Sequence, residues 1–567
     1  MSTKNSKPNQ FFKNIYKNDR LKGFVKSCSI VLASSSVALA TVLGLYNRNF
    51  LDVAIGEAVL PVLIALLTSI FLYLIFIFFT KDRLFSVVAV MASSIFLTKF
   101  ENFFIRFKDF IDDFVVWSTP YDYQYVLLLL FLFLALGILI ITLIKKKLPH
   151  GVLSKFRQLL KFFVLASVIF TSTYIVQIAI KFVRYPDLIN GDHTLNSKIS
   201  LGKSVKPDIY YFIFDRYANN DTLQKYYNYD NSEFKAAMEK RGFVFNKNTH
   251  SNYPYTATSL SSTFNSSYLN SITEDLPGNY SELFYRRLIA NNNNFKTLQE
   301  NGYTYYHSGS WWGTTRTNPN ANYNFVDAFS IKILGKKYVT TDFQDTLLEG
   351  TIFRRLFAAR IPLFSRIIHY EKNDQRQIVN YQLGAAKELV QKSTSENIFG
   401  LFHILSPHPQ YVFDAEGNVP SYHPDPKTLD VPESVKYVNQ LKYINTRILE
   451  TVDYIIQNSD TEPIIVFQTD EGPYLFDCND FSNCSWNSTD EERWQWKFGV
   501  LSAIYQPKKD TRYDVTPVNL FPYLFNTYFN TSVEYQDANS YIFNLEEDSY
   551  NFTEVTELLK KSLPGSQ

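Results

Sequence analysis

Long uncharged stretches and short charged segments alternate along the first part of the chain. Four of the stretches have about the 20 residues that a membrane-spanning helix needs, and they cover residues 27–45, 58–80, 123–144 and 162–180. A shorter stretch, residues 84–98, lies between charged residues, and leaving it out would put the flanking loops on inconsistent sides of a membrane. We therefore predict a polar N-terminal segment, residues 1–26, and a five-helix transmembrane domain, residues 27–181.

The basic residues predict how these helices are oriented, because cytoplasmic loops are enriched in lysine and arginine. Lysine and arginine gather in residues 1–26, 81–83 and 145–157, which share a side when five spans are counted. The loop of residues 100–122 carries more acidic residues than basic ones. This predicts a multi-pass protein of the cytoplasmic membrane, with a cytoplasmic N-terminus and an extracytoplasmic C-terminal part. A cleaved signal peptide is the alternative for residues 27–45, but the run is long for one.

Composition narrows the class of protein. Of the 567 residues, 46% are hydrophobic and 19% are charged, which is too apolar for a disordered chain and too charged for a wholly membrane-embedded one. The formal net charge of +2 gives no case for a nucleic-acid partner. No Asp, Glu, Lys or Arg interrupts the five apolar stretches, which favours an anchor over a transporter. Three cysteines exclude a disulfide-rich scaffold.

A different pattern follows a polar linker, residues 182–206. Over residues 207–567, short apolar runs rich in strand formers alternate with longer helical patterns. The predicted strands cover residues 208–214, 397–405, 463–468 and 500–505, and the predicted helices cover residues 221–241, 432–457 and 518–528. Such alternation is typical of an α/β domain with a mainly parallel sheet.

Two of the predicted strands end in carboxylates. Asp215 follows Ile-Tyr-Tyr-Phe-Ile-Phe, and Asp470 and Glu471 follow Pro-Ile-Ile-Val-Phe-Gln-Thr. Ligands of open α/β sheets gather beyond the carboxyl ends of the strands, so both strand ends would face the same crevice. Either acidic end taken alone is more often a turn or a helix cap, but their joint occurrence favours a functional site.

Five motifs, in order along the outer domain, resemble the sulfatase-like branch of the alkaline phosphatase superfamily. They are KPDIYYFIFDRY (206–217), SNYPYTATSLSS (251–262), HSGSWWGTTR (307–316), FHILSPHPQY (402–411) and VFQTDEGPY (466–474). Within that branch the chain is similar to the membrane-anchored lipoteichoic acid synthases and phosphoethanolamine transferases, whose five-span anchor it also resembles. The resemblance implies that residues 207–567 form an extracytoplasmic sulfatase-like catalytic domain.

The resemblance implies a threonine nucleophile in the SNYPYT segment, which corresponds to Thr256. A helix that starts there would offer backbone N–H groups to a phosphate. Ser251, Thr258 and Ser259 are neighbouring hydroxyls that stay open as alternatives, and a hydroxyl-rich helix cap would explain the segment without catalysis. Sulfatases proper use a modified Cys or Ser in a C/S-x-P-x-R pattern, and this pattern is missing from the sequence, which argues against sulfate-ester hydrolysis.

A metal site is also implied by the resemblance. Asp215 corresponds to a metal-binding carboxylate, and Asp470 to the aspartate of the family's Asp-His-Gly motif, in which Glu471 replaces the histidine. With Thr256, these residues form an all-oxygen set. Such a set suits Mg²⁺ or Mn²⁺ better than Zn²⁺.

Substrate contacts are implied by three further residues. Trp312 and Arg316 correspond to residues that hold the glycerol phosphate group in the synthases, with Trp311 an alternative to Trp312, and His408 to a histidine that contacts the phosphate or assists the acceptor. We expect His403 to be a core histidine of an apolar strand and leave the role of His307 open.

The function that the resemblance implies is metal-dependent transfer of a phospho-head group, for example glycerol phosphate, from a membrane lipid to a hydroxyl acceptor in the cell envelope through a phosphothreonine. The implied donor is phosphatidylglycerol-like, and the implied acceptor is a glycan or growing polymer. Two alternatives remain: a phosphodiesterase or sulfatase on the same fold, and a non-catalytic envelope-assembly protein that has lost its metal through the change to Glu471.

Two further features are not part of this site. Residues 351–370 carry four arginines among large apolar residues, which fits either a helix that touches anionic lipid heads or an ordinary surface helix. Cys478 and Cys484 lie in the predicted extracytoplasmic part, and their separation permits a disulfide, with two unpaired thiols as the alternative.

Overall fold

The computed structural model describes residues 19–112, 123–190, 206–246, 249–274, 276, 279–325, 329–358, 368–392, 396–428, 430–473, 496–507, 513–544 and 548–561. The chain divides into two compact units. The membrane unit comprises Met1–Arg184 and Ser330–Glu371, and the α/β unit comprises Tyr185–Phe329 and Lys372–Gln567. The sequence analysis assigned everything after residue 207 to one outer domain. The grouping of residues 330–371 with the N-terminal helices is therefore a difference from that expectation.

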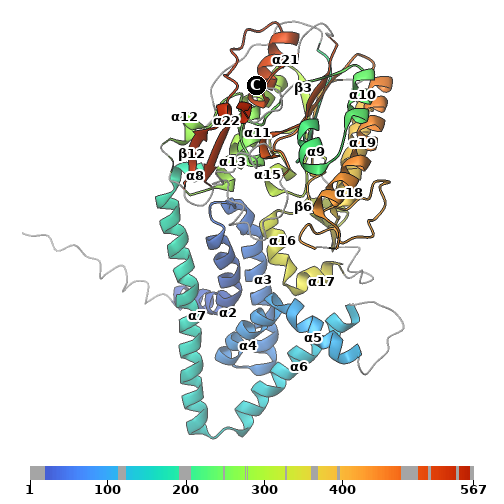
Figure 1. The fold of residues 1–567 in the computed structure, drawn as a ribbon. Coiled ribbons are helices and arrows are strands. Elements are labelled where there is room, and N and C mark those ends of the chain that lie inside the picture. The colour runs from blue at the N-terminus through green and yellow to red at the C-terminus, as the bar shows by residue number, and fades with distance from the viewer. Residues whose placement is uncertain are drawn as a thin grey trace, which may run out of the picture. The chain divides into compact units, whose positions relative to one another are not determined.

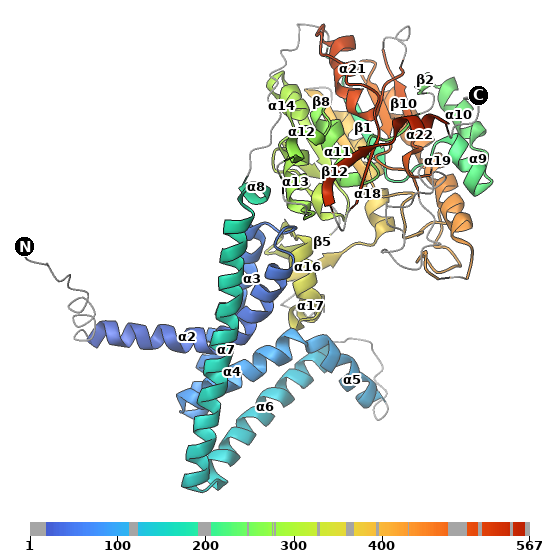
Figure 2. The same ribbon diagram turned by 60° about the vertical axis from the view of Figure 1, so that its left-hand side comes forward.

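The N-terminal helices of the membrane unit follow the predicted spans closely. They are α2 (Asp19–Arg48), α3 (Ile55–Thr80), α4 (Arg83–Thr98), α5 (Phe100–Asp112), α6 (Tyr123–Lys147) and α7 (His150–Arg184). In the part of the chain that the structure describes, four of them are long and apolar enough to cross a membrane. The number rises to five if α4 and the first part of α5, which are bent by 72° (Figure 2), form one span. The expected multi-span helical domain is confirmed.

The charged link between the second and third of these helices shows how sequence sets a helix boundary. Lys81 ends α3 in a left-handed conformation with a φ of 51°. One oxygen of the Asp82 carboxylate then accepts hydrogen bonds from the backbone N–H groups of Leu84 and Phe85, at 3.1 and 3.3 Å, at the start of α4. This is the side-chain cap that satisfies the unpaired donors of a first helical turn.

Residues 330–371 form what we call the inserted arm. It contains α16 (Asp342–Glu349), α17 (Ile352–Ala358) and most of a three-stranded sheet of order β6-β5-β7, with β5 at Phe329–Ile333, β6 at Lys336–Val339 and β7 at Ile368–Lys372. Ile352 packs in one cluster with Phe100 of α5 and Val126 of α6. The guanidinium of Arg355 donates to the carboxylate of Glu101, with Nε to Oε2 at 2.8 Å.

These contacts revise the expectation for residues 351–370. The segment is not one helix, because α17 covers Ile352–Ala358 and residues 368–370 belong to strand β7. Arg355 forms an ion pair with Glu101, and both residues belong to the membrane unit. A helix that touches lipid heads would have paired this arginine with a lipid phosphate. Arg360 and Arg366 lie outside the described residues.

The α/β unit is built on a seven-stranded sheet of order β2-β10-β9-β1-β8-β3-β4 (Figure 1). β9, β1, β8, β3 and β4 are parallel, and β10 is antiparallel to β9 and β2, which confirms the mainly parallel sheet. The bounds are β1 Ile209–Phe214, β2 Phe243–Phe245, β3 Tyr303–Ser308, β4 Tyr323–Phe325, β8 Asn397–Ile404, β9 Ile464–Gln468 and β10 Ser502–Tyr505. A separate hairpin joins β11 (Tyr541–Asn544) and β12 (Asp548–Glu554).

Helices cover both faces of this sheet, so its central strands are apolar on both sides. In β1 the alternate residues Tyr210, Phe212 and Phe214 face one core, while Ile209, Tyr211 and Ile213 face the other. The first core is closed by α9 (Asn220–Tyr227), α10 (Ser232–Lys240), α18 (Gln375–Lys392) and α19 (Glu433–Asn458). The second is closed by α11 (Thr256–Asn265), α13 (Glu282–Ala290), α14 (Asn293–Glu300) and α21 (Leu520–Tyr528).

Short helices complete the unit: α8 (Pro186–Asn190), α12 (Asn270–Thr273), α15 (Gly313–Arg316), the 3₁₀ turn Pro517–Asn519 and α22 (Thr556–Lys561). One helix predicted from the sequence is two helices in the structure. Residues 221–241 form α9 and α10 because Asn228 adopts a left-handed conformation with a φ of 48° and ends α9. Asparagine is one of the few non-glycine residues that readily takes this conformation.

Candidate active site

Three adjacent parallel strands bring buried polar side chains together at their carboxyl ends. In the register of β8, β1 and β9, Ile213 lies beside His403 on one side and beside Gln468 on the other. Side chains of a strand alternate between faces, so Asp215 continues the face of Ile213, and Asp470 continues the face of Gln468. One face of the sheet therefore carries Asp215, His403 and Asp470 side by side.

These three residues form a compact group of potential metal ligands. One donor atom from each lies within 4.8 Å of the others, and the side chains are 3%, 0% and 2% exposed. Among the described residues, no hydrogen-bond partner is found for Oδ1 of Asp215, Nε2 of His403 or either carboxylate oxygen of Asp470. Buried polar atoms almost always have a hydrogen-bond partner. A group of such atoms without partners fits the ligand set of a divalent cation.

The pKa values of the three residues also favour a bound cation. Burial, reinforced by Asp470 and Glu471, raises the pKa of Asp215 well above its usual range. Burial and then Glu471 raise the pKa of Asp470 to about 7, while the neighbouring Thr256 hydroxyl lowers it. Burial also lowers the pKa of His403 to about 3, which leaves a neutral imidazole, the form that binds metals. A bound cation would offset the repulsion between the carboxylates.

The His403 ring is held in a metal-binding orientation. Its Nδ1 lies 2.6 Å from the Thr315 hydroxyl. With Nε2 as the ligand atom, Nδ1 carries the proton and donates to that hydroxyl, which is the usual support of a ligating histidine. Sequence analysis expected a core histidine here. The residue is buried as expected, and one of its ring nitrogens lies within 4.8 Å of a carboxylate oxygen of each aspartate.

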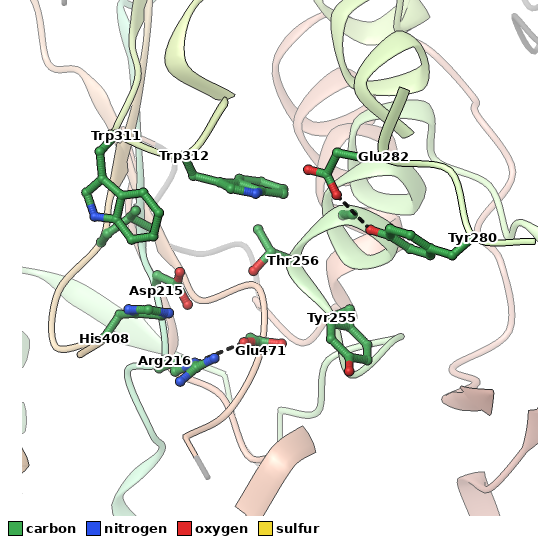
Figure 3. Close-up of a pocket in the computed structure, with 12 residues that line it drawn as sticks. Asp215, Arg216, Tyr255, Thr256, Tyr280, Glu282, Trp311, Trp312, His408 and Glu471 are labelled. Atoms are coloured by element: carbon green, nitrogen blue, oxygen red, sulfur yellow. Dashed lines mark hydrogen bonds and ion pairs between the residues drawn. The ribbon is translucent and has the colours of Figure 1, made fainter. Parts of the chain in front are cut away.

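Thr256 lies at the start of α11 and lines a pocket of about 250 Å³ next to this group (Figure 3). The N-terminal turn of a helix offers backbone N–H groups to an anion. The pocket residues are Asp215, Arg216, Tyr255, Thr256, Ala257, Tyr280, Glu282, Trp311, Trp312, Leu405, His408 and Glu471.

Glu471 has partners that the sequence did not reveal. Its Oε1 accepts from Nε of Arg216 at 3.0 Å, and its Oε2 accepts from Nζ of Lys497 at 2.7 Å. All three side chains are almost completely buried. Arg216 and Glu471 directly follow Asp215 and Asp470 in turns beyond the strands, and both line the same pocket as Asp215 and Thr256. The structure shows both carboxylate oxygens of Glu471 in ion pairs and places His403 beside the two aspartates. Glu471 as a metal ligand stays a prediction.

Gly472 lets this ion cluster form. A Cβ atom at this position would lie 2.0 Å from the carbonyl oxygen of Trp496, so only glycine fits. Its backbone N–H donates to the carbonyl of Lys497 at 2.6 Å. The Asp-Glu-Gly turn therefore packs directly on the segment that carries Lys497. Burial lowers the pKa of Lys497 to about 7, and Glu471 opposes that shift.

The HSGSWWGTTR segment folds back on itself to present its tryptophans. His307 lies 2.7 Å from the Thr315 carbonyl, which can only accept, so Nε2 donates and Nδ1 accepts from the Tyr305 hydroxyl at 2.8 Å. Both ring nitrogens of His307 are thus used structurally. Arg316 is 2% exposed and donates from Nη2 to the carbonyl of Trp311 at 2.8 Å. Among the described residues that line the pocket, Trp311 and Trp312 are present and Arg316 is not.

His408 lines the pocket on the loop after β8. Its backbone N–H donates to the carbonyl of Asp215 at 3.2 Å, which ties the loop to the end of β1. Its Nδ1 contacts the Pro409 carbonyl and so must carry the proton, which leaves Nε2 as a proton acceptor. Burial and the nearby Arg216 lower the pKa of His408 well below its usual value. His408 is therefore neutral, and its Nε2 is a hydrogen-bond acceptor.

Comparisons with known proteins add the following findings. A scan of protein-family models and a search of curated protein sequences each found no match. The chain is similar to the solved C-terminal periplasmic domain of EcEptC from Escherichia coli, with 10% identity and a TM-score of 0.40 over 65% of this chain and 98% of that one. It is similar to the soluble domain of lipooligosaccharide phosphoethanolamine transferase A from Neisseria meningitidis (12% identity, TM-score 0.35, 57% of this chain and 92% of that one). It is also similar to the lipoteichoic acid synthase LtaP from Listeria monocytogenes (10% identity, TM-score 0.36, 64% of this chain and 83% of that one). These are the kinds of protein that the five sequence motifs resemble.

Proposed function

We propose that this chain is a metal-dependent transferase that moves a phospho-head group from a membrane lipid to a hydroxyl acceptor of the cell envelope. The observation that carries the proposal is the placement of Thr256. Its hydroxyl lies at a helix start, in one pocket with Asp215, and near enough to Asp470 to lower the pKa of that carboxyl. A hydroxyl nucleophile, an anion-binding helix start and a buried ligand group are the parts that phosphoryl transfer needs.

Asp215, His403 and Asp470 would hold the ion, with the Thr256 hydroxyl beside them. When bound, a divalent ion would lower the pKa of that hydroxyl and offset charge on the phosphate. The all-oxygen set of the sequence analysis, with Glu471, favoured Mg²⁺ or Mn²⁺. An imidazole in place of that carboxylate makes Zn²⁺ a third candidate.

The other residues have roles that follow from their positions. Thr256 Oγ would attack the lipid phosphorus and pass its proton to the diacylglycerol oxygen as the bond between that oxygen and phosphorus breaks, so that the head-group phosphate remains on Thr256. An acceptor hydroxyl, bound by Nε2 of His408, would then attack the phosphorus, and its proton would pass by way of His408 to the Thr256 oxygen as that oxygen is released. Arg216, on the pocket wall, would stabilise the phosphate charge, and Arg316 would act indirectly by holding the Trp311–Trp312 turn.

One specific observation favours an ammonium-bearing head group over the glycerol phosphate of the sequence analysis. Figure 3 shows Thr256 between Asp215 and Glu282, with Trp312 near Glu282. Glu282 accepts from the Tyr280 hydroxyl at 2.9 Å and from the Thr314 hydroxyl. A fixed carboxylate beside aromatic rings attracts a cation and repels an anion. A zwitterionic head group, such as phosphoethanolamine, would place its phosphate at Thr256 and its ammonium at Glu282.

The proposed location is the cytoplasmic membrane, with the N-terminus in the cytoplasm and the α/β unit outside. This orientation rests on the distribution of lysine and arginine among the links between the spans. The lipid donor and the envelope acceptor would both be accessible from that side.

A donor assay tests the proposal. The purified full chain is incubated with fluorescent phosphatidylethanolamine or phosphatidylglycerol in the presence of Mn²⁺, Mg²⁺ or Zn²⁺, and release of diacylglycerol is measured. We expect metal-dependent release that Thr256→Ala abolishes, and a loss of phosphatidylethanolamine use alone in Glu282→Gln. Equal release by wild type and Thr256→Ala would refute the assignment of the nucleophile. Release without any phosphorylated acceptor would indicate a hydrolase.

A further inference from the structure

The inserted arm begins with a hairpin of unusual surface character, formed by β5 and β6. At its tip, Leu334 is 77% exposed, and Ile333 and Tyr338 are 40% and 46% exposed. Lys332, Lys336 and Lys337 lie on the same two strands. We call residues 330–339 the lysine hairpin.

The turn of the lysine hairpin is unusual for its sequence. In the antiparallel register of the two strands, Lys332 lies directly opposite Lys337. The two-residue turn has Leu334 at a φ of 49° and Gly335 at 81°. Such turns normally place Asn, Asp or Gly first, because a bulky side chain disfavours the left-handed conformation. A leucine exposed at such a turn position is a feature that an external apolar partner would explain.

The position of the hairpin indicates the partner. Two residues after β6, α16 packs on the helix ends of the membrane unit. The Phe343 ring lies edge-on to the Tyr46 ring at 6.2 Å near the end of α2, and Gln344 donates to the Glu57 carbonyl at the start of α3 at 3.3 Å. Farther along the arm, Ile352 packs beside Phe100, where α5 begins after the end of α4.

These helix ends share one side of the membrane unit. α2 ends and α3 begins there, α4 returns to that side after the link at residues 81–82, and α5 follows α4. Phe343 lies four positions after Val339, and an extended chain spans at most about 14 Å over that length. The base of the lysine hairpin therefore lies within reach of the lipid head groups on that side, and this holds whichever way the protein is oriented.

We propose that the lysine hairpin binds the anionic lipid surface of the membrane in which the helices sit. Lys332, Lys336 and Lys337 contact lipid phosphates, and Leu334 and Tyr338 enter the boundary between head groups and acyl chains. Basic residues attract anionic head groups, and an apolar tip adds burial that charge alone does not give. The proposal does not depend on the reaction of the α/β unit, because it concerns only contacts of the membrane unit.

Tryptophan quenching tests the proposal on the full chain. Leu334→Trp is reconstituted into nanodiscs of phosphatidylcholine alone, or of phosphatidylcholine with phosphatidylglycerol, using lipids brominated near the head group. The fluorescence added over the wild type is recorded. Val419→Trp, at a position of the α/β unit that is 74% exposed, is the matched control. We expect quenching of the Leu334→Trp signal that increases with phosphatidylglycerol and weakens with salt.

Charge variants complete the experiment. Replacing Lys332, Lys336 and Lys337 with Gln should remove the dependence on phosphatidylglycerol, with about a fivefold loss of surface affinity for each lysine at low salt. Replacement of all three with Arg should retain it. The thermal midpoints of the Gln and Arg variants, measured beside the wild type, show that both variants fold. Equal signals at positions 334 and 419, or quenching that is the same without phosphatidylglycerol, would overturn the proposal. A response to soluble polyphosphate in place of lipid would overturn it in favour of an anionic polymer.

Discussion

Glu471→Gln separates the ion-pairing role of Glu471 from the ligand role expected from the sequence. The substitution removes the charge and keeps the shape, which leaves Arg216 and Lys497 buried without their shared carboxylate. At 2.7 and 3.0 Å, each ion pair has a gross attraction of about 6 kcal/mol at an effective dielectric constant near 20. Relaxation reduces this, since Lys497, with a pKa already lowered to about 7, can lose its proton. Removing one partner of a buried ion pair typically costs about 3–5 kcal/mol.

Thermal unfolding of the full chain in detergent measures this cost. We expect the midpoint of Glu471→Gln to fall by about 10 °C relative to wild type. Asp453→Asn is the matched control, because Asp453 binds Arg241 through two hydrogen bonds of 2.6 and 2.7 Å, but on the surface. Exposed pairs contribute at most about 1 kcal/mol, so its midpoint should fall by no more than about 4 °C.

A metal titration of the same variant completes the test. Because both carboxylate oxygens of Glu471 accept hydrogen bonds from cations, Mn²⁺ affinity should change by less than about threefold, which is under 1 kcal/mol. A variant that is as stable as wild type but has lost its Mn²⁺ affinity would refute this reasoning and restore Glu471 as a ligand.

Three further predictions follow from the site and the topology. His403→Gln should weaken Mn²⁺ binding by at least about tenfold in calorimetric titration, and an unchanged affinity would return His403 to a purely structural role. Phosphatase fusions after Lys206 should be active and fluorescent-protein fusions dark, and the opposite pair of results would reverse the topology. Cys478 and Cys484, which lie outside the described residues, should be linked in the non-reduced protein, and alkylation of both thiols before reduction would contradict this.

The elements that sequence predicted well have local signals. The membrane helices are visible as uncharged runs between charged links, and β1, β8 and β9 as apolar runs that end at polar residues. Asp215 and Thr256 lie in one pocket, although they come from separate motifs. Each of these elements has its signal within a single segment. Predicting it did not require knowing which segments pair in the fold.

What the sequence could not reveal depends on pairing between distant segments. Lys497 reaches Glu471 across 26 positions with no motif to mark it. His403 lies beside Asp215 only because β8 is the neighbour of β1, although its place near a strand end was a usable signal. Glu471 was assigned by motif, and its ion pairs with Arg216 and Lys497 have no signal in the sequence. Residues 351–370 fit either a lipid-touching helix or a surface helix by sequence, and only contacts group the inserted arm with the membrane helices.

The most direct test of the central claim is the mass of Thr256 during turnover. Wild-type protein is mixed with phosphatidylethanolamine or phosphatidylglycerol and a divalent ion, quenched in acid, digested and analysed by mass spectrometry. The proposed function predicts a head-group phosphate on the peptide that contains Thr256, dependent on metal and missing in Thr256→Ala. An adduct on a different residue, or full turnover by Thr256→Ala, would contradict it.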